Sequence, residues 1–220
     1  MTHIKICGIR SLEEALWAAE AGADALGFIL VPSSKRYIET QLVREITAGL
    51  PPYIARIGVF ANTPPAEVEE VAKLSGLTGI QLHGDEDPVE YRGISLPLIK
   101  ALKVPVGEEQ PSKKNKQFPD IQAWQGIVQG ILVDSVYAGQ FGGTGCQLPW
   151  DDELSQALFD SVKASKIPLI LAGGLTLQNV CEGISKVQPY AIDVSSGVER
   201  NGKKDPALIK EIIQNVKLRT

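Results

Sequence analysis

The chain has 220 residues, of which 44% are hydrophobic and 22% charged, and its formal net charge is −4. This length allows one or two domains with a sizeable core, and the composition is that of an ordinary globular protein. No basic stripe, membrane-length apolar run or leader segment is found, so we expect a cytoplasmic protein without nucleic-acid or membrane partners.

Short apolar runs rich in Val, Ile and Leu recur along the whole chain. Such runs are typical of strands buried on both faces in a parallel sheet. The predicted strands are His3–Cys7, Ala25–Val31, Ile54–Phe60, Gly79–Leu82, Leu98–Leu102, Gly130–Val133, Pro168–Leu171 and Ala191–Val194.

Helical patterns fill most of the gaps, and many begin at a capping residue or a proline. The predicted starts are Ser11 (with Glu14 as its capping box), Thr40, Thr63, Asp87, Thr176 and Asp205. A further helix is predicted from the stripe Leu154, Ala157, Leu158 and Val162. The pattern fails between Val104 and Gly126, where we expect an exposed excursion with one helical turn at Ile121–Trp124.

Eight alternations without a linker predict an α/β fold, a single-domain (β/α)8 TIM barrel that spans residues 1–220. The alternative is a doubly wound open sheet, which usually has fewer strands and a glycine fingerprint after the first strand. Here the glycine-rich loops follow the sixth and seventh predicted strands, which favours the barrel.

Glycines and serines gather in the loops after the last three predicted strands, and the loops after the last two strands bind phosphate in many barrels. Glycines let backbone N–H groups approach an anion closely, and serine hydroxyls add donors. Tight turns would explain one such loop easily but three adjacent loops poorly. The predicted phosphate-binding residues are Gly142, Gly143, Gly145, Gly173, Gly174, Ser195, Ser196 and Gly197.

Two charged residues lie on strands that become neighbours when the barrel closes. Lys5 and Asp193 are expected to face the interior, because side chains alternate along a strand and helices cover the outside. A buried ion pair is the simplest explanation for Lys5. For Asp193 the alternative is a hydrogen bond to a substrate hydroxyl.

Four further residues at strand ends are candidates for chemistry. Cys7 is either a buried small hydrophobe or a reactive thiol. Asp134 is either structural or an acid beside the glycine loop. Arg36 is either solvated or a ligand for a carboxylate, and His83 is a titrating group or a hydrogen-bond donor.

The cysteines and histidines exclude two further kinds of site. Cys7, Cys146 and Cys181 are odd in number and widely spaced, which fits reduced thiols better than a disulfide framework or a zinc site. His3 is far from His83 in the sequence, so we expect no metal site.

Eight motifs follow one another along the whole chain: Lys5–Ile9, Gly27-Phe28, Ser34–Ile38, Gly58–Phe60, Gln81–Asp85, Asp134–Gly145, Ala172–Leu175 and Asp193–Glu199. In this order they resemble the motifs of the phosphoribosylanthranilate isomerase family. The resemblance implies a barrel that performs an Amadori rearrangement of N-(5-phosphoribosyl)anthranilate in tryptophan biosynthesis, without a metal or cofactor. The segment from Val104 to Gly126 is the weakest correspondence.

The resemblance also implies roles for individual residues. Cys7 matches the general base and Asp134 the general acid, while Arg36 matches the residue that binds the anthranilate carboxylate. His83 and Asp193 match residues that line the substrate site. The expected partner is therefore a small phosphosugar–anthranilate substrate, and the chain is expected to be a monomer or a weak homodimer.

Three other functions fit parts of the pattern. A Schiff-base aldolase would use Lys5 or Lys100 as its nucleophile. A phospho-ligand-binding regulatory barrel would need the phosphate loops but neither Cys7 nor Asp134. A barrel that isomerises the aminoaldose of histidine biosynthesis usually carries an aspartate where Cys7 stands.

Overall fold

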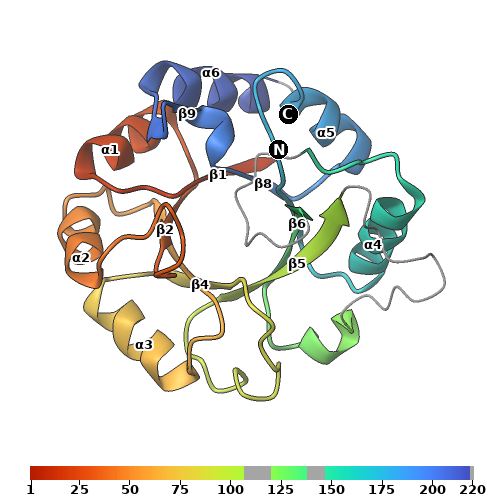
Figure 1. Cartoon of the computed structure of the whole chain (residues 1–220), viewed down its shortest axis with the longest axis horizontal. Helices are drawn as coiled ribbons and strands as arrows, with labels where there is room; N and C mark the ends of the chain where they lie inside the picture. Colours follow the sequence, from red (N-terminus) through yellow and green to blue (C-terminus); the bar gives the residue numbers. More distant parts are fainter. Residues whose placement is uncertain (107–119, 138–146, 219–220) are drawn as a thin grey trace.

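Eight parallel strands form a closed barrel in chain order in the computed structural model, which describes residues 1–106, 120–137 and 147–218. Figure 1 looks down this barrel, with its strands around the centre. The strands are β1 (His3–Cys7), β2 (Ala25–Ile29), β3 (Ala55–Phe60), β4 (Gly79–Leu82), β5 (Leu98–Val106), β6 (Gly130–Tyr137), β7 (Leu169–Leu171) and β8 (Ala191–Val194). The predicted barrel is confirmed, and the open sheet is excluded because β1 pairs with β8.

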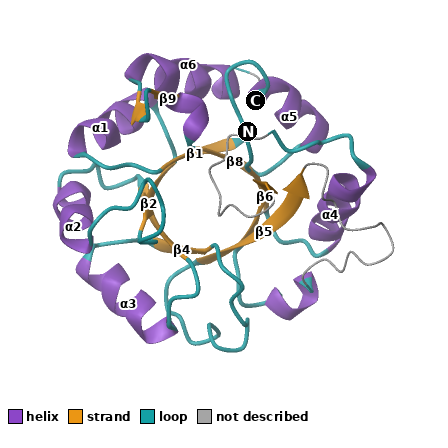
Figure 2. Cartoon of the chain, viewed as in Figure 1, coloured by secondary structure: helices purple, strands orange, loops and turns teal. Residues whose placement is uncertain are grey.

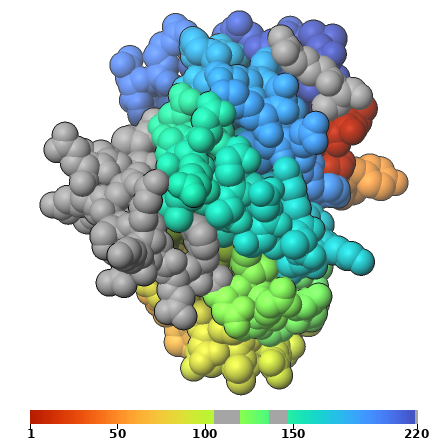
Figure 3. All heavy atoms as spheres, turned by 90° about the vertical axis from the view of Figure 1, so that its right-hand side faces the viewer, coloured from red at the N-terminus to blue at the C-terminus, as the bar shows by residue number. Residues whose placement is uncertain are grey.

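The helices of the described residues surround the barrel, as Figure 2 shows. They are α1 (Leu12–Ala21), α2 (Thr40–Ala48), α3 (Pro65–Leu74), α4 (Glu153–Ala164), α5 (Val180–Val187) and α6 (Pro206–Lys217). Figure 3 shows the side on which α4 and α5 follow one another around the outside. None of the helices in this part of the chain is long and apolar enough to cross a membrane.

The caps of α1 and α6 explain where these two helices begin. Ser11 Oγ accepts a hydrogen bond from the backbone N–H of Glu14 at 3.1 Å, and Asp205 accepts from the N–H groups of Ala207 and Leu208. Each cap satisfies backbone donors that a helix start leaves without a partner. Both predicted starts are confirmed, and α1 and α6 pack side by side against the strands.

Two other predicted helix starts are wrong, and a third is right in position but not as a cap. Thr40 is the first residue of α2 rather than its cap. The chain after β4 forms turns instead of a helix, and Asp87 accepts from the N–H of Val89 within one of them. The helix predicted at Thr176 begins at Val180, because the side chain of Asn179 accepts from the Thr176 N–H and closes a turn first.

Strands β5 and β6 run four residues further than predicted. They pair with each other from Ile99 and Gly130 up to Val106 and Tyr137. Asp134 therefore lies within β6 and not beyond its end. Strand pairing depends on backbone groups, so it continues past the point where the apolar run stops.

The predicted excursion is described only in part. Residues 107–119 lie outside the described residues. The helical turn predicted at Ile121–Trp124 is confirmed as the 3-10 helix η1, with Asp120 as its side-chain cap.

Candidate active site

A cavity opens at the carboxyl ends of the barrel strands. Its empty space, including the mouth, amounts to about 970 Å³. Most of the predicted site residues line it, namely Cys7, Arg36, His83, Asp134, Gly173, Gly174, Asp193, Ser195 and Ser196. The cavity thus collects side chains from distant parts of the sequence, as expected of a barrel active site.

Four further residues were predicted to bind phosphate. Gly142, Gly143 and Gly145 lie outside the described residues. Gly197 is not among the residues that line the cavity. A Cβ atom at its position would lie 1.9 Å from the carbonyl oxygen of Leu175, so glycine is required there for close packing.

Asp134 is a buried acid that faces the cavity from β6. Its side chain is only 14% exposed. Burial raises the pKa of Asp134 to about 7, and the negative charge of Asp193 adds to the effect. A substantial fraction of Asp134 therefore carries a proton at neutral pH, as a general acid requires.

Cys7 ends β1 and is buried, with 5% of its surface exposed. Burial raises the pKa of the Cys7 thiol, and Asp193 raises it further, whereas Lys5 and Lys204 oppose the shift. The protonated thiol is therefore the main form in the free protein at neutral pH.

Two glycines make room for the site residues. A Cβ atom on Gly27 of β2 would lie 2.6 Å from Cys7 Sγ. Gly8 has a positive φ of 80°, and a Cβ atom there would lie 2.7 Å from Cδ of Arg36. Any larger residue at either position would displace a candidate catalytic or binding side chain.

The predicted ion pair between Lys5 and Asp193 is confirmed. Lys5 Nζ lies 2.9 Å from Asp193 Oδ2, and both side chains are buried. Burial lowers the pKa of Lys5, but the charges of Asp193 and Cys7 outweigh this effect and raise it overall. The other oxygen of Asp193, Oδ1, is buried and has no hydrogen-bond partner within the described ranges. Asp193 is also among the residues that line the cavity.

Gln81 connects Lys5 to His83, and sequence reasoning assigned it no role. Lys5 Nζ donates to Gln81 Oε1 at 3.0 Å, and Gln81 Nε2 lies 3.0 Å from His83 Nδ1. His83 Nε2 lies 3.6 Å from Asp134 Oδ2. The alternation of side chains along β4 places Gln81 and His83 on one face, which was the only sequence signal for this link.

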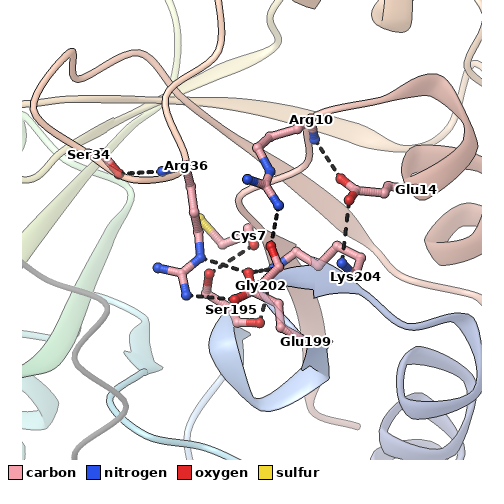
Figure 4. A network of polar contacts seen from close by, with 9 residues as sticks. All are labelled: Cys7, Arg10, Glu14, Ser34, Arg36, Ser195, Glu199, Gly202 and Lys204. Carbon is pink, nitrogen blue, oxygen red and sulfur yellow. Dashed lines mark hydrogen bonds and ion pairs between the residues drawn. The ribbon is translucent and has the colours of Figure 1, made fainter.

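Arg36 is held by an acidic residue from a distant hairpin. After β8 the chain forms the 3-10 helix η2 (Ser196–Val198) and the hairpin strands β9 (Glu199–Arg200) and β10 (Lys203–Lys204). Arg36 Nε and Nη2 donate to the two carboxylate oxygens of Glu199, each at 2.7 Å, as Figure 4 shows. This fork uses two of the five N–H donors of an arginine.

Lys204 is the second cation on Glu199. Its Nζ lies 2.8 Å from Glu199 Oε1 and donates to the carbonyl of Ser195 at 3.0 Å, and its side chain is fully buried. Burial raises the pKa of Glu199, but the hydrogen bond from Arg36 and the charge of Lys204 outweigh it and bring it to about 2. Arg36 and Lys204 carry two positive charges against the one negative charge of Glu199, and of these three residues Arg36 lines the cavity.

The hairpin is fixed to helix α1. The buried carboxylate of Glu14 accepts from the backbone N–H groups of Arg10 and Lys204 (Figure 4). The guanidinium of Arg10 donates to the carbonyl of Gly202. No local sequence pattern shows that Lys204 is buried, so sequence reasoning missed the roles of Glu199 and Lys204.

Lys100 forms a separate buried pair away from the cavity. Its Nζ donates to the carbonyl of Gly84 at 2.7 Å and contacts Glu86. Glu86 also accepts from the N–H groups of Asn62 and Gly84. Within the described ranges, no group of three His, Cys, Asp or Glu residues could hold a metal ion.

The sequence of this barrel matches the model of a known enzyme family. The sequence model of "N-(5'phosphoribosyl)anthranilate (PRA) isomerase" matches residues 4–215. The chain belongs to this family. An N-(5'-phosphoribosyl)anthranilate isomerase from Desulfitobacterium hafniense strain Y51 is 45% identical, over 99% of this chain and 98% of the relative.

Solved structures of family members are similar throughout. A phosphoribosyl anthranilate isomerase in complex with reduced 1-(o-carboxyphenylamino)-1-deoxyribulose 5-phosphate has 37% identity and a TM-score of 0.78, with 99% of each chain covered. Monomers generated from the dimeric enzyme of Thermotoga maritima have 36% identity and a TM-score of 0.78, also over 99% of each chain.

Proposed function

We propose that this chain acts by general acid–base catalysis, with Asp134 as the acid and Cys7 as the base. The activity is the isomerisation of N-(5'-phosphoribosyl)anthranilate to 1-(2-carboxyphenylamino)-1-deoxyribulose 5-phosphate in tryptophan biosynthesis. The observation that carries the assignment is a buried carboxyl with a pKa of about 7 in the same cavity as a buried thiol.

The first step opens the furanose ring. Asp134 gives its proton to the ring oxygen while the lone pair of the anilino nitrogen forms a C=N bond and the ring C–O bond breaks. The product is an open-chain iminium ion and the Asp134 carboxylate. A positioned acid contributes about 10²–10⁴-fold to such a step.

The second step removes the proton from C2 of the sugar. The Cys7 thiolate takes this proton, and the C–H electrons form an enolamine that tautomerises to the ketone. The raised pKa of Cys7 keeps the thiolate scarce in the free protein. Lys5 and Lys204 favour it, and the positive iminium formed in the first step acts in the same direction.

The walls of the cavity supply the binding groups. Arg36 retains N–H donors for the anthranilate carboxylate after its fork to Glu199, and the net positive charge there favours an anion. The free Oδ1 of Asp193 suits a sugar hydroxyl. His83 lines the same space, and the loops at Gly173-Gly174 and Ser195-Ser196 suit the phosphate. The sequence pattern alone assigns Gly197, Gly142, Gly143 and Gly145 to the same phosphate site.

The arrangement of the lysines argues against a Schiff-base mechanism. Lys5 is paired with Asp193, which holds it in the charged form that is not nucleophilic. Lys100 is paired with Glu86 and is not among the residues that line the cavity. A regulatory barrel is disfavoured because Cys7 and Asp134 both face the ligand space.

The wider setting is also part of the proposal. We take residues 1–220 as one catalytic domain that acts in the cytoplasm on a small molecule and needs no cofactor. A monomer or weak homodimer is proposed, and the Thermotoga maritima relative is described as dimeric.

The test is the variant Asp134→Asn, with Asp160→Asn on the exposed face of α4 as control. The amide cannot donate an acid proton, so turnover, followed by the loss of substrate fluorescence, should fall by at least about 10²-fold. Affinity for a reduced product analogue should change little. Turnover at the wild-type rate would refute the assignment.

The same variant should be more stable than the wild type at pH 8. A carboxyl whose pKa is raised in the folded state ionises more easily in the unfolded state. Asp134 therefore lowers the free energy of unfolding as the pH rises from about 3.8 to about 7. The shift from 3.8 to about 7 sets an upper limit of about 4 kcal/mol. Urea unfolding at pH 5 and pH 8 measures the difference.

A further inference from the structure

A chain of polar contacts crosses the cavity from β1 to β6. It runs from the Lys5 ammonium to the Gln81 amide, then to the His83 ring and on to the Asp134 carboxyl. The three separations are 3.0, 3.0 and 3.6 Å. Gln81 is 1% exposed, so no solvent contact competes for its amide group.

The chemistry of each group fixes the direction of these contacts. An ammonium only donates, so the Gln81 atom beside Lys5 is the oxygen, and the amide N–H₂ faces His83. That amide donates, so His83 Nδ1 accepts. A neutral imidazole has one N–H, and in His83 it is therefore on Nε2, the nitrogen that faces Asp134.

His83 is neutral in this environment. Its side chain is 18% exposed, and burial lowers its pKa to about 4. The cations Lys103, Lys5 and Lys100 act in the same direction, and Glu86 opposes them. Asp134 faces the ring from β6 and is itself protonated to a large extent at neutral pH.

We propose that Gln81 is a positioning residue that holds His83 in the Nε2–H tautomer, so that His83 donates to Asp134 Oδ2. His83 Nε2 is buried and has no hydrogen-bond partner among the described residues, and 3.6 Å is long for a hydrogen bond. The contact strengthens when Asp134 loses its proton, because a carboxylate is a better acceptor than the neutral acid.

Two consequences follow for catalysis. Oδ2 faces the Nε2–H of His83, so His83 favours the acidic proton of Asp134 on the other oxygen. His83 stabilises the carboxylate that remains after proton transfer and does not itself exchange protons with the substrate. The proposal rests on Asp134 as the general acid.

The tautomer is measurable because the chain has only two histidines. Long-range ¹H–¹⁵N correlation spectra of the full-length, ¹⁵N-labelled protein report which ring nitrogen carries the proton, and the variant His3→Gln assigns the signals. We expect the Nε2–H tautomer for His83 from pH 6 to pH 8. An Nδ1–H tautomer or an imidazolium at pH 7 would overturn the proposal.

The variant Gln81→Glu tests the cause, with Gln122→Glu on η1 as the exposed control. A carboxylate cannot donate to Nδ1 but accepts from it, so His83 should gain a proton on Nδ1. The acidic limb of the pH–rate profile should shift when His83 is protonated on Nδ1. A folded Gln81→Glu protein with the Nε2–H tautomer unchanged would refute the proposal.

Gln81→Met keeps the volume and adds no charge, so it serves if Gln81→Glu does not fold. We expect a mixture of His83 tautomers and a fall in kcat of about threefold to tenfold, with a smaller change in KM, from the loss of one hydrogen bond. An unchanged tautomer with unchanged kcat would refute the role of Gln81. These spectra do not depend on turnover. They can therefore refute the role of Gln81 while the Asp134→Asn result still supports Asp134 as the acid, and the Asp134→Asn result can refute the acid while the spectra still show the tautomer.

Discussion

Two buried lysines of the barrel form ion pairs that differ in one respect. Lys5 on β1 pairs with Asp193, and Lys100 on β5 pairs with Glu86. Both oxygens of Glu86 have protein partners, from Lys100, Asn62 and Gly84. Asp193 Oδ1 has none within the described ranges, and Asp193 is among the residues that line the cavity.

This difference separates a structural pair from a functional one. Burying a charge costs free energy unless hydrogen bonds satisfy it. The Glu86 pair is satisfied internally and fixes the loop after β4 to β5. The Asp193 pair retains a buried acceptor without a partner in the described residues, and we propose that it is the functional pair. Variants on the two sides should therefore affect different properties.

The largest effect on turnover should come from Cys7→Ala, on the Lys5 side. Removing the base should lower kcat by about 10²–10⁴-fold. The midpoint of urea unfolding should show that the variant still folds. Cys181→Ala on α5 is the matched control, and its turnover should equal that of the wild type. Normal turnover by Cys7→Ala would reduce Cys7 to a packing residue.

Asp193→Asn should have an intermediate effect. The amide removes the charge that pairs with Lys5 and weakens the acceptor at Oδ1, so kcat/KM should fall by about tenfold to a hundredfold. Steady-state kinetics with the fluorescent substrate measure this change. If kcat/KM stayed the same and only stability fell, Asp193 would belong to the same class as Glu86.

Glu86→Gln should have the smallest effect on turnover and a clear effect on stability. Leaving Lys100 buried without its anion should cost about 3–5 kcal/mol of unfolding free energy, whereas Glu90→Gln, an exposed control, should cost little. The kcat of the folded protein should be unchanged. A large fall in kcat would contradict the comparison.

The pH dependence of stability tests the same pair. Burial raises the pKa of Glu86, but Lys100 and backbone N–H groups outweigh it and lower the pKa below its ordinary value of 4.5. A depressed folded pKa contributes stability above the unfolded value, and this contribution is lost as the pH falls through the folded value. Wild-type stability should therefore fall below pH 4.5 more steeply than that of Glu86→Gln.

The sequence by itself determined the barrel and the residues near the carboxyl ends of its strands, and it predicted that Lys5 and Asp193 face each other in the interior. These follow from local rules: apolar runs predict buried strands, alternation predicts which side chains face inward, and parallel strands end at one rim. The helix starts at Ser11 and Asp205 were predictable because a cap acts on the next three residues.

Only the tertiary structure decided the partners of those residues. The fork from Arg36 to Glu199 spans 163 positions, and the contact between Lys5 and Gln81 spans 76. Burial and the pKa of Asp134 depend on how closely distant strands pack, and no local pattern in a sequence specifies that. The hydrogen-bond direction through Gln81 likewise depends on the ammonium, the amide and the imidazole lying next to one another in the folded barrel.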